Sequence, residues 1–552
     1  MSVIQTKLLS SLVKVFPDQE PDALPHSCAT ALRGEVYTFQ VGYRLNRFVN
    51  QLNVKVESAL GDAVTLRRVE SVPSLLPIYA EHDDYLLRTA PGLFPDVLKP
   101  FDRFPIQREN IWHSAWVTIE IPQDMQAGDY SVSVVFSGED EEGKRTQLAR
   151  ETFALTILDA VLPKQKLLYT AWFHVDGITG YYDVEPYSER CWELLESFMK
   201  MAASRGQNMI LTPVFTPPLD TAVGGERQTV QLVDVTVKPD GGYVFGFDKL
   251  RRWIALCRKV GIENLEISHL FTQWGAKHAP KVMATIEATG EYKRIFGWET
   301  DAAGNEYTGF LTEFLKDLDE VLKEERMDKN TYFHASDEPG LAHLEQYKKV
   351  SGILRSLVPD YPIMDALSNY DFYADGLVEM PIPATDHIEP FLDNNVRDLW
   401  TYYCCGQTHQ VSNRLFSFPS ARNRVLGVQL YKFEIAGFLQ WGYNFYNSCL
   451  SQEKVNPFVT TDAGEAFPSG DAFVVYPGPE GAWSSIRLEV FHEALQDQRA
   501  LQLAESLVGR QKVLEVLEYG IGPITFKEYP HGDAWLLSVR ERINVLIADA
   551  VK

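Results

Sequence analysis

The sequence predicts a multidomain α and β protein, in which an N-terminal antiparallel β-sandwich precedes a (β/α)8 TIM-like barrel with C-terminal helices. At 552 residues the chain is too long for one hydrophobic core. Its first part shows short alternating runs, and from residue 167 the rhythm changes to strand and then helix. We therefore expect a β-sandwich domain over 1–163, a catalytic barrel over 164–484, and a helical segment over 485–552 packed on the barrel.

The sandwich is predicted from alternating apolar and polar residues between turn residues such as Gly128-Asp129. No long helical pattern interrupts these runs, which favours antiparallel sheets. A stretch over 159–165 that contains Pro163 marks the expected boundary. The predicted strands cover residues 36–45, 52–59, 64–72, 116–121, 130–136 and 152–158.

The barrel is predicted from eight candidate strands with helical patterns between several of them, which fits a (β/α)8 barrel better than a doubly wound sheet. A β-hairpin over 229–247 is expected as an insertion after the second strand. The strands are expected at 167–173, 209–214, 265–268, 331–336, 363–367, 377–380, 399–404 and 437–443. The helices are expected at 189–204, 247–260, 310–323, 341–357, 486–507, 510–519 and 535–551.

Composition narrows the classes of partner. Formal net charge is −23, and a polyanion would be repelled, so we expect no nucleic-acid and no anionic-membrane partner. No stretch approaches the ~20 apolar residues of a membrane span, and no glycine-rich nucleotide fingerprint follows a strand. Without a visible signal peptide we expect a cytoplasmic protein, or one that uses a non-standard export route. A homo-oligomer is compatible with the sequence.

The cysteines and histidines predict neither a disulfide framework nor a metal site. Six cysteines are scattered without CxxC spacing, and the adjacent pair Cys404-Cys405 lies in an apolar run typical of buried thiols. The histidines do not cluster with them. We therefore expect no metal and no cofactor.

Two adjacent carboxylates, Asp337 and Glu338, stand where a predicted strand gives way to a helix, in the heptapeptide HASDEPG (334–340). Pro339 is expected to hold Glu338 in an extended conformation. Acids at such positions often only cap the next helix. In barrels, however, the carboxyl ends of the strands carry the catalytic groups.

Aromatic and neutral polar residues follow several predicted strands, and a barrel would bring them to one face. Aromatic rings stack on sugar rings, and polar side chains satisfy sugar hydroxyls whose burial would otherwise cost free energy. The set predicts a carbohydrate site, although aromatic rings also close ordinary barrel mouths. The candidate substrate-binding residues are His174, Asp176, His269, Gln273, Trp274, Trp400, Tyr402, Trp441, Tyr443 and Asn444.

An ordered set of motifs resembles glycoside hydrolase family 123, the β-N-acetylgalactosaminidases, along the whole chain. The Asp-Glu-Pro motif alone is a weak signal, and the ordered set is a strong one. Members of this family have a β-sandwich on a (β/α)8 barrel. The motifs are FHVDG (173–177), LTPVFTPPLDT (211–221), SHLFTQWGAKHAP (268–280), HASDEP (334–339), MDALSNYDFY (364–373), WTYYC (400–404), GFLQWGYNFYN (437–447) and GDAFVVYPG (470–478).

The resemblance implies a retaining, substrate-assisted hydrolase that releases terminal β-linked N-acetylgalactosamine from oligosaccharides or glycoconjugates. In this scheme the 2-acetamido oxygen of the sugar is the nucleophile and forms an oxazolinium intermediate, an exception to the two-carboxylate scheme. Carried over by motif, Glu338 is the general acid and base, and Asp337 orients the acetamido group. Tyr402 and Tyr443 are assigned to its carbonyl, and Trp400 and Trp441 to the walls.

Three alternatives remain at this stage. A conventional retaining enzyme would use a carboxylate nucleophile ~5–5.5 Å from the acid, and Asp176, Glu379 and Asp386 are candidates. The sugar could instead be a β-linked N-acetylglucosamine or a hexose without an acetamido group. The chain could also be a non-catalytic glycan-binding protein.

Overall fold

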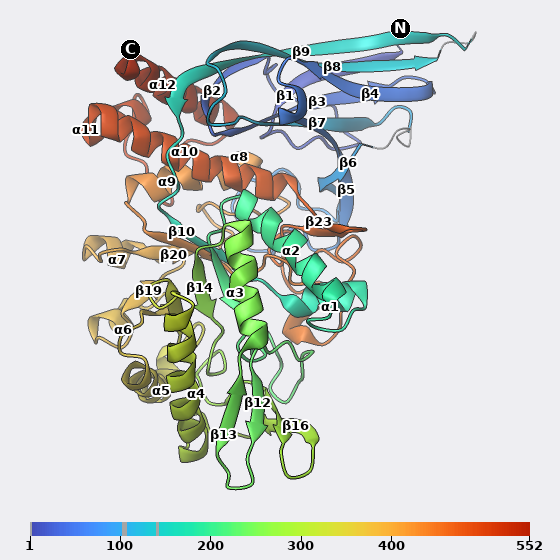
Figure 1. Ribbon diagram of the computed structural model, residues 1–552. Coiled ribbons are helices and arrows are strands. Elements are labelled where there is room, and N and C mark those ends of the chain that lie inside the picture. Colours follow the sequence, from blue (N-terminus) through green and yellow to red (C-terminus); the bar gives the residue numbers. More distant parts are fainter. Residues whose placement is uncertain (1–2, 102–107, 140–142) are drawn as a thin grey trace.

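The computed structural model describes residues 3–101, 108–139 and 143–552. A β-sandwich forms one end of the molecule, and both chain termini lie near that end (Figure 1). The barrel lies below it, and the three C-terminal helices pack between the two (Figure 1). The predicted architecture of a sandwich, a barrel and C-terminal helices is confirmed.

The sandwich consists of two sheets that share a core containing Phe39, Val117 and Phe153, all fully buried. The first sheet has the order β1 (Ile4–Ser10), β3 (Val36–Leu45), β7 (Trp112–Glu120), β5 (Val64–Ser74) and β6 (Gly92–Pro100). The second has the order β2 (Cys28–Arg33), β9 (Arg145–Val161), β8 (Gly128–Glu139) and β4 (Asn50–Ser58).

All six predicted sandwich strands are present, and β1, β2 and β6 are additional. Strand β6 contains Pro95 and Pro100, and proline argues against a strand because it cannot donate to the ladder. The sheets are antiparallel except for the β2–β9 pair, which is parallel.

Eight parallel strands form the barrel, in the order β19-β18-β17-β14-β11-β10-β21-β20. The ends meet through a bridge between Ala384 and Tyr402, where the Thr385 amide donates to Tyr402 O at 2.9 Å. All eight predicted strands are present, although the sixth, predicted at 377–380, lies at 380–382 and shares only Met380 with the prediction. The strands are β10 (Leu168–Ala171), β11 (Met209–Thr212), β14 (Asn264–Ile267), β17 (Thr331–His334), β18 (Ile363–Ala366), β19 (Met380–Ile382), β20 (Trp400–Tyr402) and β21 (Gly437–Gln440).

The longer barrel helices follow the sequence pattern closely. Helix α2 begins after Ser188, whose side chain accepts a hydrogen bond from the Cys191 amide, and its apolar stripe is buried. Helix α3 ends at Gly261, which takes the left-handed conformation that glycine adopts without strain. The barrel helices are α1 (Val175–Tyr182), α2 (Glu189–Ser204), α3 (Asp248–Val260), α4 (Asn305–Glu324), α5 (Leu344–Leu357), α6 (Tyr370–Ala374), α7 (Glu389–Asp393), α8 (Ser420–Arg424) and α9 (Leu426–Lys432).

A small sheet projects from the far end of the barrel (Figure 1). The predicted hairpin is its first half, β12 (Asp234–Val237) and β13 (Tyr243–Gly246). A second hairpin, β15 (Val282–Ile286) and β16 (Glu291–Phe296), pairs with it through β12 and β15. A two-stranded ribbon, β22 (Tyr476–Gly478) and β23 (Gly481–Trp483), precedes the C-terminal helices.

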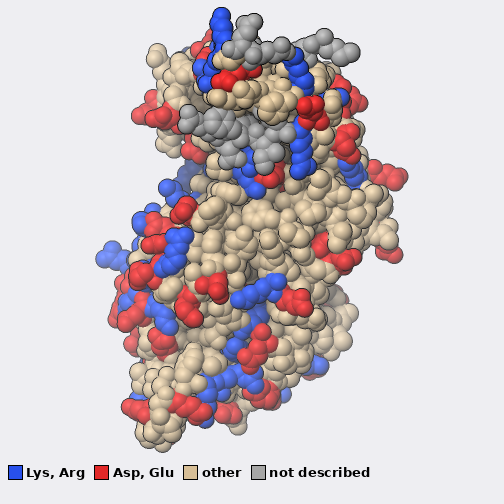
Figure 2. Space-filling view, turned by 90° about the vertical axis from the view of Figure 1, so that its right-hand side faces the viewer, with Lys and Arg blue, Asp and Glu red and all other residues tan. Residues whose placement is uncertain are grey.

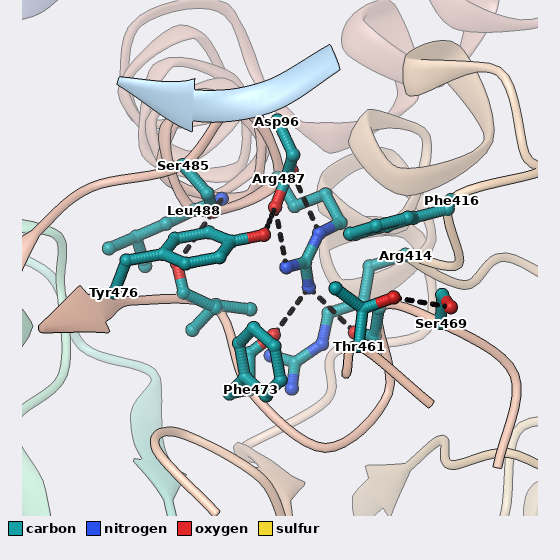
Figure 3. A network of polar contacts seen from close by, with 12 residues as sticks. Asp96, Arg414, Phe416, Thr461, Ser469, Phe473, Tyr476, Ser485, Arg487 and Leu488 are labelled. Carbon is teal, nitrogen blue, oxygen red and sulfur yellow. Dashed lines mark hydrogen bonds and ion pairs between the residues drawn. The ribbon is translucent and has the colours of Figure 1, made fainter. Parts of the chain in front are cut away.

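The C-terminal helices are α10 (Ile486–Val508), α11 (Arg510–Leu517) and α12 (Asp533–Val551). Helices α10 and α12 contact both larger parts of the molecule, and α11 packs against α10 and α12. One hydrophobic cluster joins Leu98 and Trp116 of the sandwich to Val490 and Leu501 of α10. Buried ion pairs cross the same boundary, and Figure 3 shows Arg487 of α10 facing Asp96 of β6.

The surface carries mixed charges. On the face in Figure 2, basic and acidic side chains lie intermixed, and a broad area below the sandwich bears few charges. Within the described ranges, no helix has the length and apolar character needed to cross a membrane.

Candidate active site

A cavity of about 330 Å³ opens at the carboxyl ends of the barrel strands. Apolar and aromatic side chains form most of its wall, and three carboxylates also face it. The lining residues are Trp172, Leu219, Asp220, Gln273, Trp274, Asp337, Glu338, Ala366, Tyr402, Cys404, Cys405, Leu439, Trp441, Cys449, Leu450 and Phe467.

The acid pair lies in this cavity, but its backbone differs from the expectation. Strand β17 ends at His334, and Glu338 has φ +45°, in the left-handed region rather than the extended one. Two hydrogen bonds from neighbouring strand ends hold this turn: the Trp274 amide donates to Asp337 O at 3.0 Å, and the Glu338 amide donates to Ala366 O at 2.9 Å. The turn, and not an extended segment, therefore separates the two carboxylates.

The two carboxylates have different surroundings. The Tyr402 hydroxyl donates to Glu338 Oε1 at 2.7 Å, and Glu338 is exposed to the cavity. Among the described residues, no hydrogen bond or ion pair holds the Asp337 side chain. Burial, Glu338 and further acidic neighbours raise the pKa of Asp337 well above its usual value. The Asp337 carboxyl thus stands unengaged in the cavity wall, and its charged form is costly.

A buried polar cluster around Glu266 of β14 contacts the cavity wall through Trp172. Thr170 and Trp172 donate to the Glu266 carboxylate at 2.5 and 2.7 Å, and His334 Nε2 lies 2.6 Å from it. His269 stacks on His334 with ring centroids 4.3 Å apart. Burial, with a smaller electrostatic contribution from the neighbouring His334 ring, lowers the pKa of His269 well below its usual value. His269 is therefore a neutral group beneath the cavity wall and does not line the cavity.

His174 and Asp176 also lie outside the cavity. Arg227 donates to both oxygens of Asp176 at 2.7 and 2.9–3.0 Å, and its Nη2 lies 3.2 Å from His174 Nδ1. Asn444 Oδ1 accepts from the His174 amide, and Asn444 Nδ2 donates to His174 O. The polar groups of His174, Asp176 and Asn444 are therefore engaged in a buried hydrogen-bond network and do not face a substrate. The sequence pattern did not reveal that Arg227 is the counter-charge of Asp176.

Of the aromatic residues predicted to contact the acetamido group, some line the cavity and others lie outside it. Trp441 lines the cavity, and its Nε1 donates to Asp471 Oδ2 at 2.8 Å. Trp400 packs against Gly437, where an added Cβ would meet its ring at 2.0 Å, and it does not line the cavity. Tyr443 points away, since its hydroxyl donates to Phe198 O at 2.8 Å. The structure therefore places neither Tyr443 nor Trp400 in the cavity wall, away from the acetamido contact and the wall predicted for them.

Comparison with known proteins identifies the family. The family model for the glycoside hydrolase 123 catalytic domain matches residues 172–504. The chain belongs to glycoside hydrolase family 123. The solved structure of a family 123 glycoside hydrolase from Clostridium perfringens has a TM-score of 0.74 at 16% identity, with 99% of each chain covered. A β-glucuronidase from Bifidobacterium dentium has a TM-score of 0.33 at 8% identity, with 90% of this chain and 67% of that chain covered. No functionally curated protein matches the sequence.

Within this family 123 hydrolase, Gln273 and Trp274 are the remaining predicted residues that reach the cavity. The Gln273 side-chain oxygen accepts a hydrogen bond from the Asp220 amide. Trp274 has φ +56° and remains 43% exposed, so its ring stands at the rim. These two residues come from the loop after β14 and join the acid pair, Tyr402 and Trp441.

The sequence pattern missed several cavity residues of the hydrolase. Asp220 follows β11 and accepts from the Leu450 amide at 2.9 Å, and burial raises its pKa to about 6. Its position after a strand could have indicated it. Cys449, Leu450 and Phe467 belong to a long segment after β21 without periodic pattern, so only the tertiary structure places them. Within the described residues no group of three His, Cys, Asp or Glu side chains is arranged to hold a metal ion.

Proposed function

We propose that this glycoside hydrolase releases terminal β-linked N-acetylgalactosamine by substrate-assisted catalysis. The observation that carries the proposal is the unengaged Asp337 carboxyl beside Glu338 in one cavity lined mainly by apolar and aromatic side chains. Asp337 is free to accept the acetamido N–H of a bound sugar, and the apolar lining suits the acetamido methyl group.

In this mechanism Glu338 acts as the general acid. It protonates the glycosidic oxygen while the acetamido carbonyl oxygen attacks the anomeric carbon and the aglycone leaves. Asp337 orients the acetamido group and stabilises the positive charge of the oxazolinium intermediate. Glu338 then removes a proton from the water that opens the ring, so the anomeric configuration is retained. The hydrogen bond from Tyr402 keeps the Glu338 carboxylate turned into the cavity.

The positions of the other carboxylates support this mechanism over a protein nucleophile. Asp176 is held by Arg227, Glu379 pairs with Arg355 at 3.2 Å, and Asp386 pairs with His387 at 2.7 Å. None of these three candidates lines the cavity. Asp220 does line it, and Asp220→Asn is therefore the variant that tests a conventional nucleophile.

The decisive experiment is a panel of aryl β-glycosides of N-acetylgalactosamine, N-acetylglucosamine and galactose. We expect the first to be hydrolysed fastest and the plain galactoside not at all. Hydrolysis of the galactoside at a similar rate would remove the acetamido group from the mechanism. The Clostridium perfringens enzyme was analysed for glycolipid glycan hydrolysis, so a glycolipid glycan should be tested beside the aryl glycosides.

A second experiment separates the roles of the two acids. Asp337→Asn should lower kcat and weaken inhibition by a thiazoline analogue of the intermediate. Glu338→Gln should lower the rate about 10²–10⁴-fold for substrates with poor leaving groups, the usual contribution of a general acid. Unchanged thiazoline inhibition in Asp337→Asn would contradict the assisted mechanism.

The competing sugar is N-acetylglucosamine, which shares the acetamido group and differs at C4. The same panel of aryl glycosides distinguishes the two sugars. Faster hydrolysis of the glucosaminide would identify N-acetylglucosamine as the substrate sugar and would leave the proposed mechanism unchanged. Binding of N-acetylgalactosamine in calorimetry without turnover of any glycoside would instead favour a glycan-binding protein.

A further inference from the structure

Three of the six cysteines of the chain line the catalytic cavity, namely Cys404, Cys405 and Cys449. Nothing in the proposed hydrolysis uses a thiol. Cys191 and Cys257 are buried elsewhere in the core, and Cys28 is exposed on the sandwich. The thiols are therefore concentrated beside the acid pair, where they are partly accessible.

The adjacent pair is held in place by its backbone. Strand β20 ends at Tyr402, so the next side chains are not forced to opposite faces, and both Cys404 and Cys405 face the cavity. The Cys404 amide donates to the Gln407 side-chain oxygen at 2.8 Å, and Cys404 O accepts from Asn413 Nδ2 at 2.8 Å. The two thiols are adjacent in the chain and belong to one cavity wall.

The state of these thiols limits what they can bind. The hydrogen bond from Cys405 and burial raise the pKa of Cys404 well above its usual value, so its thiol is protonated at neutral pH. A reagent that needs a thiolate should react slowly there. The described residues also offer no three-ligand metal arrangement. A ligand that forms two covalent bonds, one to each sulfur, fits this adjacent pair better than a metal ion that needs three or four ligands.

We propose that Cys404 and Cys405 form a dithiol site for monosubstituted trivalent arsenicals, and that its occupation blocks the catalytic cavity. With phenylarsine oxide two As–S bonds form, the arsenic–oxygen bond breaks, and the oxygen leaves as water with both thiol protons. The arsenic stays trivalent, so no oxidant or reductant is required. The bound phenyl group would lie beside Tyr402, whose hydroxyl contacts Glu338.

The test measures binding and activity separately. The full chain is treated with phenylarsine oxide at neutral pH, and intact and peptide mass spectrometry count and locate the adduct. We expect one phenylarsenic group per chain, on the peptide with Cys404 and Cys405, and loss of glycosidase activity. A dithiol such as 2,3-dimercaptopropanol should reverse both, and a thiazoline inhibitor should slow both.

The variants give matched controls. Cys404→Ser and Cys405→Ser should each need about 100-fold more reagent for labelling, because closing the second bond gains that order of effective concentration. Cys28→Ser, on an exposed thiol outside the cavity, should label like the wild type. Each variant's inhibition is compared with its own untreated rate. Iodoacetamide should modify Cys28 before Cys404.

Three results would each overturn the proposal. The first is a phenylarsenic adduct on cysteines other than Cys404 and Cys405, and the second is labelling of the Cys405→Ser variant equal to that of the wild type. The third is full glycosidase activity in protein that is labelled on the pair. Because the adduct is located by mass, the binding result does not depend on which sugar the enzyme hydrolyses.

Discussion

At Glu338 the chain takes a conformation that its sequence disfavours. A residue before proline is usually extended, yet Glu338 has φ +45°. Such backbone costs of order 1–3 kcal/mol and persists where the surroundings determine it. The two backbone hydrogen bonds from the β14 loop and β18 supply that constraint here. The strain is a reason to place function at this residue, and it fixes the directions of two adjacent carboxyl groups.

Tyr402→Phe tests the orientation of Glu338. The change removes the side-chain hydroxyl that donates to Glu338, a hydrogen bond to a charged group that is worth about 1.5–3 kcal/mol. We expect kcat to fall by about 10- to 100-fold, with little change in KM. Steady-state kinetics on an aryl glycoside measure this.

Tyr403→Phe is the matched control. Its hydroxyl faces Asn423 at 3.4 Å within the core, away from the cavity. Its kcat should equal that of the wild type. An equal loss in the two variants would mean that the effect is general and does not pass through Glu338.

Asp337→Asn should stabilise the protein at neutral pH. The folded-state pKa of Asp337 lies above the unfolded value, so the folded state holds the proton more tightly, and its stability falls as pH rises through this interval. The neutral amide lacks this penalty. Melting curves from acid to neutral pH should show an advantage of the variant that grows with pH and vanishes at low pH. A variant less stable at every pH would contradict a costly Asp337 charge.

At the scale of elements, the loop after β11 is joined to α1 by a buried ion pair. Arg227 and Asp176 are nearly inaccessible, and burial alone would raise the pKa of Asp176. Arg227 outweighs this effect, so the pKa lies below its usual value. This ion pair explains why His174 and Asp176, which the sequence suggested as substrate-binding residues, instead hold the loop that carries Arg227.

Asp176→Asn should destabilise the fold by about 3–5 kcal/mol, because it leaves Arg227 buried without a counter-charge. The KM of the folded variant should match the wild type. Urea unfolding and steady-state kinetics measure the two effects. A raised KM without loss of stability would restore a direct substrate role for Asp176. Glu189→Gln, in the exposed pair with Arg252, should leave the unfolding midpoint unchanged.

At the scale of the whole molecule, a chain of contacts runs from the sandwich to the proposed catalytic cavity, and Figure 3 shows its first part, around Asp96, Arg487 and Phe473. Asp96 of β6 accepts two hydrogen bonds from Arg487 at 3.0 and 2.8 Å. Arg487 also donates to Gly470 O and Phe473 O, each at 2.6 Å. These carbonyls flank Asp471, which holds the indole of Trp441 in the cavity wall. The sandwich thus supports the wall of the proposed active-site cavity.

Arg487→Met should lower stability by about 3–5 kcal/mol, since Asp96 would remain buried and unpaired. We also expect KM to rise, because the segment that holds Trp441 loses two anchors. Asp96→Asn/Arg487→Met should be more stable than Arg487→Met alone, because the uncompensated charge is gone. Urea unfolding and kinetics measure these effects. Additive losses in the double variant would mean that the two side chains do not act as a pair.

Periodicity in the sequence was sufficient for the architecture. The barrel strands are short, apolar runs buried on both faces, and such runs stand out against amphipathic helices like α2 and α4. The acid pair was also found from sequence, because its position at the end of a strand is a local property. Strand β6 was missed because its prolines oppose the pattern.

The cavity itself was decided by tertiary structure. Neither the ion pair of Arg227 with Asp176 nor the approach of Phe467 and Cys449 to the acids leaves a local signal, since each joins segments far apart in the chain. The same holds for Trp400 and Tyr443, whose aromatic character is equally suited to packing and to sugar binding. Sequence determined which residues stand at the strand ends. Only the packing of distant segments decided which of them face the cavity.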